Sequence, residues 1–354
     1  PGSPWQSLEV LVLSNGDCCD LQAPELWGAL SQLPRLTSLS VSGLEGPASE
    51  ALGEFLSTYS SLAALELHGY SEPALPALPA TLTCLSLTDA TNLQFPPVSP
   101  SLCSLTLARC NRFLVPAAWL GSVSGMTQLT YLSLQACRLR QLPAPLAALP
   151  ALEVLDLALT DFRHLPSVQS GSCLRRLTLP CCQTQASEWA LPHLPFITHL
   201  SLARLEGEPS RQLRDRLADY SQLAELELHG YSEPALPQLP ATITHLSMSG
   251  ATALRTLPVA PSLRNLTLTR CTALVAWPDS TTAMTQLTQL SLRHCRLREL
   301  PAPLAALPAV EVLNLAHNEL QDLPALRGAA SLRRLVLCYN DLQLVPQALG
   351  SGAA

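Results

Sequence analysis

Apolar residues recur along the chain in a fixed frame, with leucine or a similar residue at the first, fourth and sixth places. The first frame holds Leu8, Leu11 and Leu13, and the last holds Leu332, Leu335 and Leu337. Fifteen frames begin at residues 8, 36, 62, 82, 102, 129, 152, 174, 197, 223, 243, 263, 287, 310 and 332. Because side chains alternate along a strand, the fourth and sixth places point to one face and the third, fifth and seventh to the other. The pattern predicts one short strand per frame, with its leucines turned inward.

The mean spacing of the frames, about 23 residues, is typical of leucine-rich repeats. One such repeat buries too few apolar groups to offset the entropy of ordering it, so neighbouring repeats have to stack. We therefore expect an α/β solenoid, a leucine-rich-repeat horseshoe with about fifteen short parallel strands on its concave face. Its convex face is expected to mix helices with extended segments.

The length of each repeat predicts what covers its convex side. In the long second repeat, Leu52, Phe55, Leu56 and Tyr59 follow helical spacing, and Leu213, Leu217 and Tyr220 do so in the ninth. The short repeats instead carry segments such as Pro-Ala-Leu-Pro-Ala-Leu-Pro, in which proline removes donors and favours an extended chain. We expect helices only where the repeat is long.

The whole array of frames is duplicated. Residues 66–76 are identical to residues 227–237, and the run 143–150 returns as 301–308. The halves cover about residues 8–173 and 174–345 and meet without a linker of their own, so residues 4–354 are expected to form a single solenoid. Residues 1–3 look like a tag remnant, and the chain is expected to be a fragment of something longer.

Composition narrows the function classes. The formal net charge is −6 and no basic cluster occurs, which argues against a nucleic-acid partner. No apolar run is long enough to span a membrane. All 21 basic residues are arginine. A GC-rich genome explains part of this bias, and selection against ubiquitin acceptors is the second explanation.

The twelve cysteines are interpreted by position rather than number. Five stand at the ninth place of a frame, where the strand ends and the chain turns inward: Cys110, Cys137, Cys182, Cys271 and Cys295. A small buried thiol suits this place, so we expect reduced cysteines and a reducing compartment.

No catalytic constellation emerges from the sequence. Cys18-Cys19-Asp20 matches a Cys-x-Asp ubiquitin-ligase motif, but it lies in a turn without the helical domain of such enzymes. His199, His229 and His245 fall on neighbouring strands without a cage of further ligands, so we interpret them as solvated surface. We expect no enzyme activity, cofactor or metal in this chain.

The concave face is the candidate site, for binding a protein. Its central lane is dominated by small hydroxyl residues, so larger side chains stand out from it. The predicted protein-binding residues are Glu66, His68, Arg109, Tyr131, Asp156, Arg176, His199, Arg204, Glu225, Glu227, His229, His245, Arg270, Arg293, His294 and Tyr339. Binding energy concentrates in such charged and aromatic anchors. Ordinary solvated surface is the alternative interpretation.

The short frames, such as residues 78–87 and 239–248, resemble the twenty-residue repeats of secreted bacterial effectors of the YopM and IpaH type. Frames with cysteine at the ninth place look more like repeats of plant-pathogen effectors and plant receptors. The resemblance implies type III secretion, action in the host cytoplasm and recognition of a host protein. In the ligase members the repeat domain selects substrates for a separate catalytic domain, so the alternative is the substrate arm of an E3 ubiquitin ligase. A purely structural spacer is the third possibility.

Overall fold

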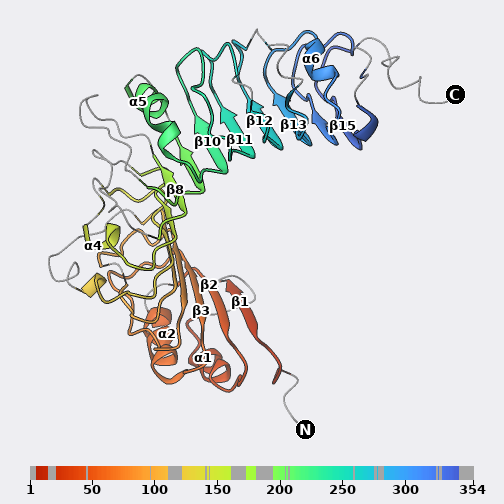
Figure 1. Cartoon of the computed structure of the whole chain (residues 1–354). Coiled ribbons are helices and arrows are strands. Elements are labelled where there is room, and N and C mark those ends of the chain that lie inside the picture. Colours follow the sequence, from red (N-terminus) through yellow and green to blue (C-terminus); the bar gives the residue numbers. More distant parts are fainter. Residues whose placement is uncertain are drawn as a thin grey trace. The chain divides into compact units, whose positions relative to one another are not determined.

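The computed structural model divides into two compact units, residues 1–183 and 184–354 (Figure 1). It describes residues 5–14, 21–44, 47–95, 97–110, 122–139, 142, 144–160, 173–180, 194–203, 205, 208–257, 260–274, 277, 283–323, 326 and 329–342. Each unit is built from short strands that pair in parallel with the strand of the next frame. That the two halves form one continuous solenoid stays a prediction.

The first unit contains eight described strands, each centred on the fourth to sixth places of its frame. They are β1 (Val10–Ser14), β2 (Ser38–Ser42), β3 (Ala64–His68), β4 (Cys84–Thr88), β5 (Ser104–Ala108), β6 (Tyr131–Ser133), β7 (Val154–Asp156) and β8 (Arg176–Leu179). The frames align in register, so that Leu39 pairs with Leu65, Leu65 with Leu85 and Leu85 with Leu105. These inward leucines are nearly inaccessible to solvent and form the spine of the unit.

The second unit repeats the arrangement with seven described strands. They are β9 (His199–Leu202), β10 (Glu225–His229), β11 (His245–Ser249), β12 (Asn265–Thr269), β13 (Gln289–Arg293), β14 (Val312–Asn314) and β15 (Arg334–Val336). The predicted leucine-rich-repeat fold is confirmed in both units. Each described strand falls on its predicted frame.

The longer helices lie in the long repeats, as predicted, but the repeats that begin at residues 129 and 287 also contain one-turn helices, which the sequence analysis did not predict. The described helices of the first unit are α1 (Pro24–Leu30), α2 (Pro47–Thr58) and α4 (Ala144–Ala147). In the described part of the second unit they are α5 (Glu208–Arg216), the 3-10 turn η1 (Leu217–Asp219), α6 (Ala302–Ala305) and the 3-10 turn η3 (Ala329–Ser331). Leu52, Phe55 and Leu56 of α2 are buried, as their spacing predicts. Residues 69–83 of a short repeat contain no helix.

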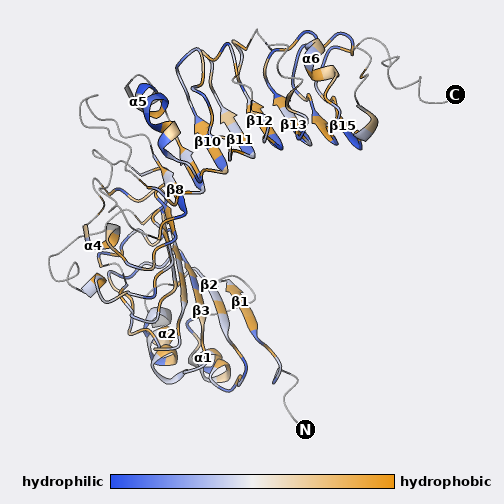
Figure 2. Ribbon diagram, viewed as in Figure 1, coloured by the Kyte–Doolittle hydropathy of each residue, from blue (hydrophilic) through white to orange (hydrophobic). Residues whose placement is uncertain are grey.

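Hydropathy separates the helices of the second unit (Figure 2). α5 is largely hydrophilic and α6 hydrophobic. Within the described residues, no helix combines the length and apolar character needed to cross a membrane.

Candidate functional site

The third, fifth and seventh places of each frame form the outward side of the strands, here called the strand face. On β3 the fifth place is Glu66 and the seventh is His68, and both are exposed. The neighbours of Glu66 in register are Ser40 and Ser86. Because serine is short, the carboxylate of Glu66 projects beyond its surroundings.

The second unit repeats this arrangement on β10. Glu227 and His229 are exposed at the same two places. The neighbours of Glu227 in register are again two serines, Ser201 and Ser247. Each unit therefore presents one projecting carboxylate with an imidazole two residues further along the strand.

A histidine and a glutamate lie side by side at the third place of β9 and β10. His199 Nε2 is 3.0 Å from Glu225 Oε1, and both side chains are partly exposed. His199 Nδ1 also lies 2.7 Å from the hydroxyl of Thr198. On the other side Glu225 is the register neighbour of His245, which contacts Thr244 in the same way. His199, which the sequence analysis interpreted as solvated surface, is thus partly exposed and lies within hydrogen-bond distance of Glu225 and Thr198.

The later strands of the first unit carry a polar network. Asp156 accepts hydrogen bonds from Gln135 Nε2 at 2.6 Å, from Ser133 Oγ at 3.3 Å and from the Ala158 amide at 3.0 Å. Ser133 is only 1% exposed, although its place in the frame predicts an outward hydroxyl on the surface. That prediction is wrong at Ser133, because the longer Asp156 is its register neighbour and hydrogen-bonds to it. Asp156 is thus occupied within the chain.

Tyr131 and Arg176 both occupy third places of the first unit. Tyr131 begins β6 and is half-buried, whereas Arg176 begins β8 and is exposed. Both are register neighbours of Val154 on β7, on its opposite sides. The structure therefore separates these two side chains by a full strand.

Several predicted site residues stand not on the strands but at the eighth place, immediately after them. This place has positive φ in twelve described frames, and four of these residues are glycine: Gly43, Gly69, Gly230 and Gly250. The others are Asp89, Arg109, Ala136, Leu159, Arg270, His294, His317 and Tyr339. In ten of these frames, all but those of Leu159 and Tyr339, the backbone N–H extends the ladder by donating to the seventh-place carbonyl of the next frame, for example Arg270 N to Arg293 O at 3.0 Å. Side chains at this place, here called the turn row, form a lane at the end of the strand face.

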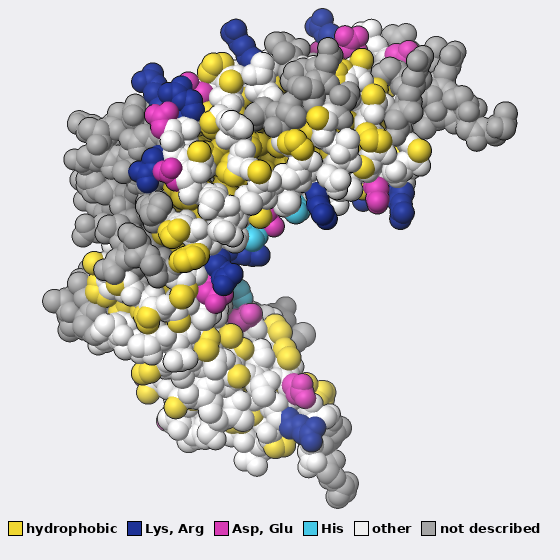
Figure 3. All heavy atoms as spheres, viewed as in Figure 1, with side chains coloured by type: hydrophobic (Ala, Val, Ile, Leu, Met, Phe, Trp, Pro, Cys, Tyr) yellow, Lys and Arg dark blue, Asp and Glu magenta, His cyan; other side chains and the backbone are white. Residues whose placement is uncertain are grey.

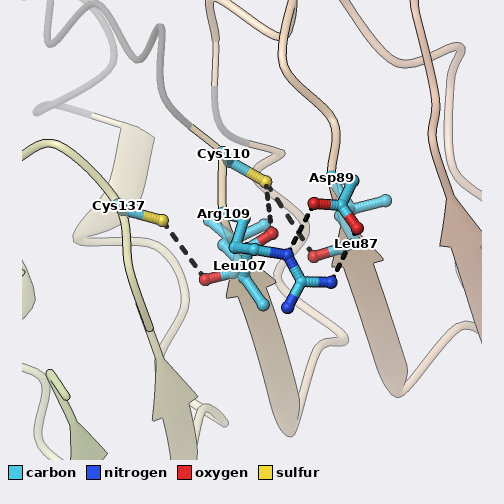
Figure 4. Close-up of polar contacts among 7 residues, drawn as sticks. Leu87, Asp89, Leu107, Arg109, Cys110 and Cys137 are labelled. Carbon is cyan, nitrogen blue, oxygen red and sulfur yellow. Dashed lines mark hydrogen bonds and ion pairs between the residues drawn. The ribbon is translucent and has the colours of Figure 1, made fainter. Parts of the chain in front are cut away.

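In the first unit the turn row contains an ion pair, shown in Figure 4. Arg109 donates from Nε to Asp89 Oδ1 and from Nη2 to Asp89 Oδ2, both at 2.6 Å. This bidentate contact holds the pKa of Asp89 below its ordinary value. Sequence analysis missed Asp89, although it directly precedes Arg109 in the row.

In the second unit the turn row ends in a stack of rings. The centroids of His294 and His317 are 4.2 Å apart at an interplanar angle of 15°, and those of His317 and Tyr339 are 4.2 Å apart at 10°. Tyr339 is 74% exposed. Arg293 lies beside the row at the seventh place of β13 and is exposed. The sequence analysis named His294 and Tyr339 but missed His317 between them.

The ninth place lies behind the turn row and is buried. Cys110, Cys137, Cys271 and Cys295 are at most 4% exposed and carry free thiols, as predicted. Cys137 Sγ is 3.3 Å from the carbonyl oxygen of Leu107, one repeat earlier (Figure 4). Burial raises the pKa of Cys271 to about 11, so the thiol stays protonated. These cysteines are structural hydrogen-bond donors.

Some predicted residues lie outside the described part of the chain. They are Arg204, Cys182 and the Cys18-Cys19-Asp20 motif. Within the described ranges, no three histidine, cysteine or acidic side chains gather as a metal site would require. The remaining predicted residues are distributed over both units. Figure 3 shows histidine, arginine and acidic side chains along the strand side of the second unit.

Comparison with known proteins supports the fold assignment. The leucine-rich-repeat family model matches residues 285–342. The leucine-rich repeat-containing G-protein coupled receptor 5 of Rattus norvegicus is 36% identical over 83 residues, which are 23% of this chain and 9% of the receptor. The chain therefore spans about a tenth of the length of this relative.

Solved structures resemble the chain over nearly its full length. A leucine-rich-repeat protein of Leptospira interrogans matches with a TM-score of 0.52 and 21% identity, over 98% of this chain and 79% of that one. Toll of Drosophila, solved in complex with Spätzle, matches with a TM-score of 0.59 and 18% identity, over 95% of this chain and 44% of that one. YopM of Yersinia enterocolitica matches with a TM-score of 0.42 and 21% identity, over 90% and 72% of the two chains. The fold of this chain is that of a leucine-rich-repeat protein.

Proposed function

We propose that this chain recognises another protein through its strand face. The observation that carries the proposal is the identical Glu-Leu-His run on β3 and β10. In both units the glutamate is exposed between two serines, whose side chains are shorter than its own. A projecting carboxylate fits a basic group of a partner.

The fold supports this proposal by analogy. Toll, whose fold this chain shares, was solved in complex with Spätzle, so a protein of this fold has a protein partner there. The strands of both units set their outward side chains on a regular lattice with a strand spacing of about 4.8 Å. Such a preorganised surface reduces the entropic cost of binding.

The charge of the two glutamates provides the test. Reversing both in the variant E66R/E227R should abolish capture of the partner, because an arginine would repel the basic group that each glutamate faces. Immobilised wild-type and variant chains would be incubated with the same eukaryotic cell lysate and compared by quantitative mass spectrometry. E54R is the matched control, because Glu54 is exposed on α2, outside the strand face. A partner retained equally by all three chains refutes the role of the strand face.

We further propose that the protein is a secreted bacterial effector that acts in the host cytoplasm. The resemblance of the short frames to effector repeats supports this, and so do the free thiols of the described cysteines, which suit a reducing compartment. A translocation reporter fused to the chain and expressed in a bacterium with a type III system would test it. Absence of signal in host cells would count against it.

A second candidate function is substrate selection for an E3 ubiquitin ligase. The observation that favours it is the complete absence of lysine among 21 basic residues, because a ligase without lysine escapes its own modification. The native gene should then encode a helical domain with a Cys-x-Asp motif on one side of this segment. Sequencing the open reading frame in both directions decides this point.

A further inference from the structure

The two units carry different side chains in the turn row, at places where the fold does not require a particular residue. Ala136 and Leu159 of the first unit adopt the same positive φ as their counterparts His294 and His317, which lie 158 residues later. The turn therefore forms without a ring.

Equivalent arginines of the two halves, Arg109 and Arg270, have different neighbours in the turn row. Arg109 follows Asp89 in the row and is bound by it through two hydrogen bonds. Arg270 is the counterpart of Arg109, but it follows Gly250. Within the described residues, Arg270 forms no ion pair. Apart from its own chain neighbours, the first described atom that a Cβ at Gly250 would meet is the amide nitrogen of Gly230, at 3.9 Å, an ordinary van der Waals contact. The position that Asp89 fills in the first unit is open in the second.

The surroundings of Arg270 are cationic and aromatic. His294 follows it in the row, and Arg293 precedes His294 on β13. The pKa of His294 is lowered, first by burial and then by the positive charges of His317, Arg270 and Arg293. An anion bound here would relieve this repulsion, and the first unit shows that a carboxylate fits an arginine at this place.

We propose that Arg270 and the ring stack of His294, His317 and Tyr339 bind an acidic segment of a partner protein. A carboxylate of the segment takes the place that Asp89 occupies beside Arg109, with two charge-assisted hydrogen bonds from the guanidinium. The stacked rings provide a flat continuation along which the segment lies, half-buried at His294 and His317 and exposed at Tyr339. This inference rests on the proposed function, since it assumes that the partner is a protein, but it concerns a different surface from Glu66 and Glu227.

A direct titration tests the site without knowledge of the natural partner. The probe is a short fluorescein-labelled peptide of alternating glutamate and serine, and its control contains glutamine for glutamate. Fluorescence anisotropy at low salt should show binding of the acidic peptide and at least about tenfold weaker binding of the neutral one. Equal binding of both peptides overturns the proposal.

The two units supply matched variants. R270Q should weaken binding of the acidic peptide at least about tenfold, whereas R109Q should leave it unchanged because Asp89 already occupies Arg109. G250D should also weaken binding, since an aspartate there supplies an internal carboxylate to Arg270, while G250N provides the neutral control. Asp89 itself shows that aspartate accepts this conformation. Thermal unfolding by circular dichroism verifies that each variant is folded.

The outcomes separate this inference from the proposed function. If R270Q binds the acidic peptide like wild type, or if G250D and G250N behave alike, the site is refuted whatever E66R/E227R does. If the acidic peptide fails to bind but a single-stranded RNA probe binds and is lost in R270Q, the row recognises nucleic acid and the proposal is wrong. Loss of peptide binding in R270Q with normal partner capture by E66R/E227R retains the acidic site and refutes the strand-face proposal.

Discussion

Replacement of Asn318, a buried side chain with several backbone hydrogen bonds, should destabilise the second unit. Asn318 occupies the ninth place of its frame and is 8% exposed. Its Oδ1 accepts hydrogen bonds from the amides of Cys295 at 2.9 Å and Leu297 at 3.2 Å. Its Nδ2 donates to the carbonyl oxygens of Leu292 at 2.6 Å and Leu315 at 2.9 Å. One side chain thus satisfies backbone groups of two successive repeats.

Asn318→Ala leaves the two amides buried without an acceptor. Each buried unsatisfied donor costs about 1–3 kcal/mol, and the carbonyls add less because they keep other contacts more easily. We expect a loss of about 3–5 kcal/mol in the free energy of unfolding. Asn340→Ala is the internal comparison: Asn340 is only half-buried and accepts a single amide hydrogen bond, from Leu320 at 3.1 Å, so it should cost about 1–2 kcal/mol.

Asn318→Cys isolates the acceptor contribution. Cysteine occupies the ninth place in other frames, and Cys295 Sγ is 3.6 Å from the carbonyl oxygen of Leu268, one repeat earlier. The thiol therefore keeps a weak donor toward Leu292 but loses the acceptor for the two amides, and stability should fall between wild type and Asn318→Ala. Urea unfolding followed by circular dichroism gives the free energies, and hydrogen exchange of residues 287–320 localises the loss. A cost of Asn318→Ala below that of Asn340→Ala would refute the reasoning.

Two further predictions concern titration and reactivity. The pKa of His294 is lowered from 6.5 by burial and by His317, Arg270 and Arg293. Its contribution to the free energy of unfolding should therefore be present above about pH 6.5 and lost as pH falls through the pKa of His294 in the folded chain. His294→Asn should reduce the shift of the urea midpoint between about pH 8 and about pH 5, and an unchanged shift would assign the pH dependence to other groups. The four described ninth-place cysteines should resist iodoacetamide in the folded chain, because burial removes access and raises the pKa of Cys271 to about 11. Mass spectrometry should find label on the exposed thiols first, and equally fast labelling of both classes would contradict the buried assignment.

The sequence alone was sufficient for the parts of the fold that depend on periodicity. Leu65, Leu67 and Cys137 were predicted to point inward from their places in the frame, and they are buried. The helix of the second repeat followed from the spacing of Leu52 and Phe55. These predictions succeed because each repeat buries the same places against its neighbours, so one rule governs all frames.

Side-chain contacts between neighbouring repeats could not be predicted from the frame alone. The burial of Ser133 depends on the length of Asp156, which stands in the next frame and 23 residues later in the chain. The pairing of His199 with Glu225 likewise depends on which side chain the adjacent strand presents. The period of the sequence predicts the position of each residue within its own repeat, whereas these contacts depend on the side chains of two neighbouring repeats. The glycines at the eighth place, such as Gly69 and Gly250, did carry a usable signal for the positive φ of the turn.

Because the array is duplicated, equivalent positions of the two units can be compared directly. Places that the fold constrains are alike in the two units: Leu132 and Leu290 are both buried, and so are Cys137 and Cys295. The eighth place is free to vary, because its turn is held by a backbone hydrogen bond that any residue donates. There the halves differ, with Ala136 in the first unit and His294 in the second, and the second unit has a stack of rings that its fold does not require. Side chains that a repeat does not need for folding are available for binding a partner. In the turn row these side chains differ between the two units.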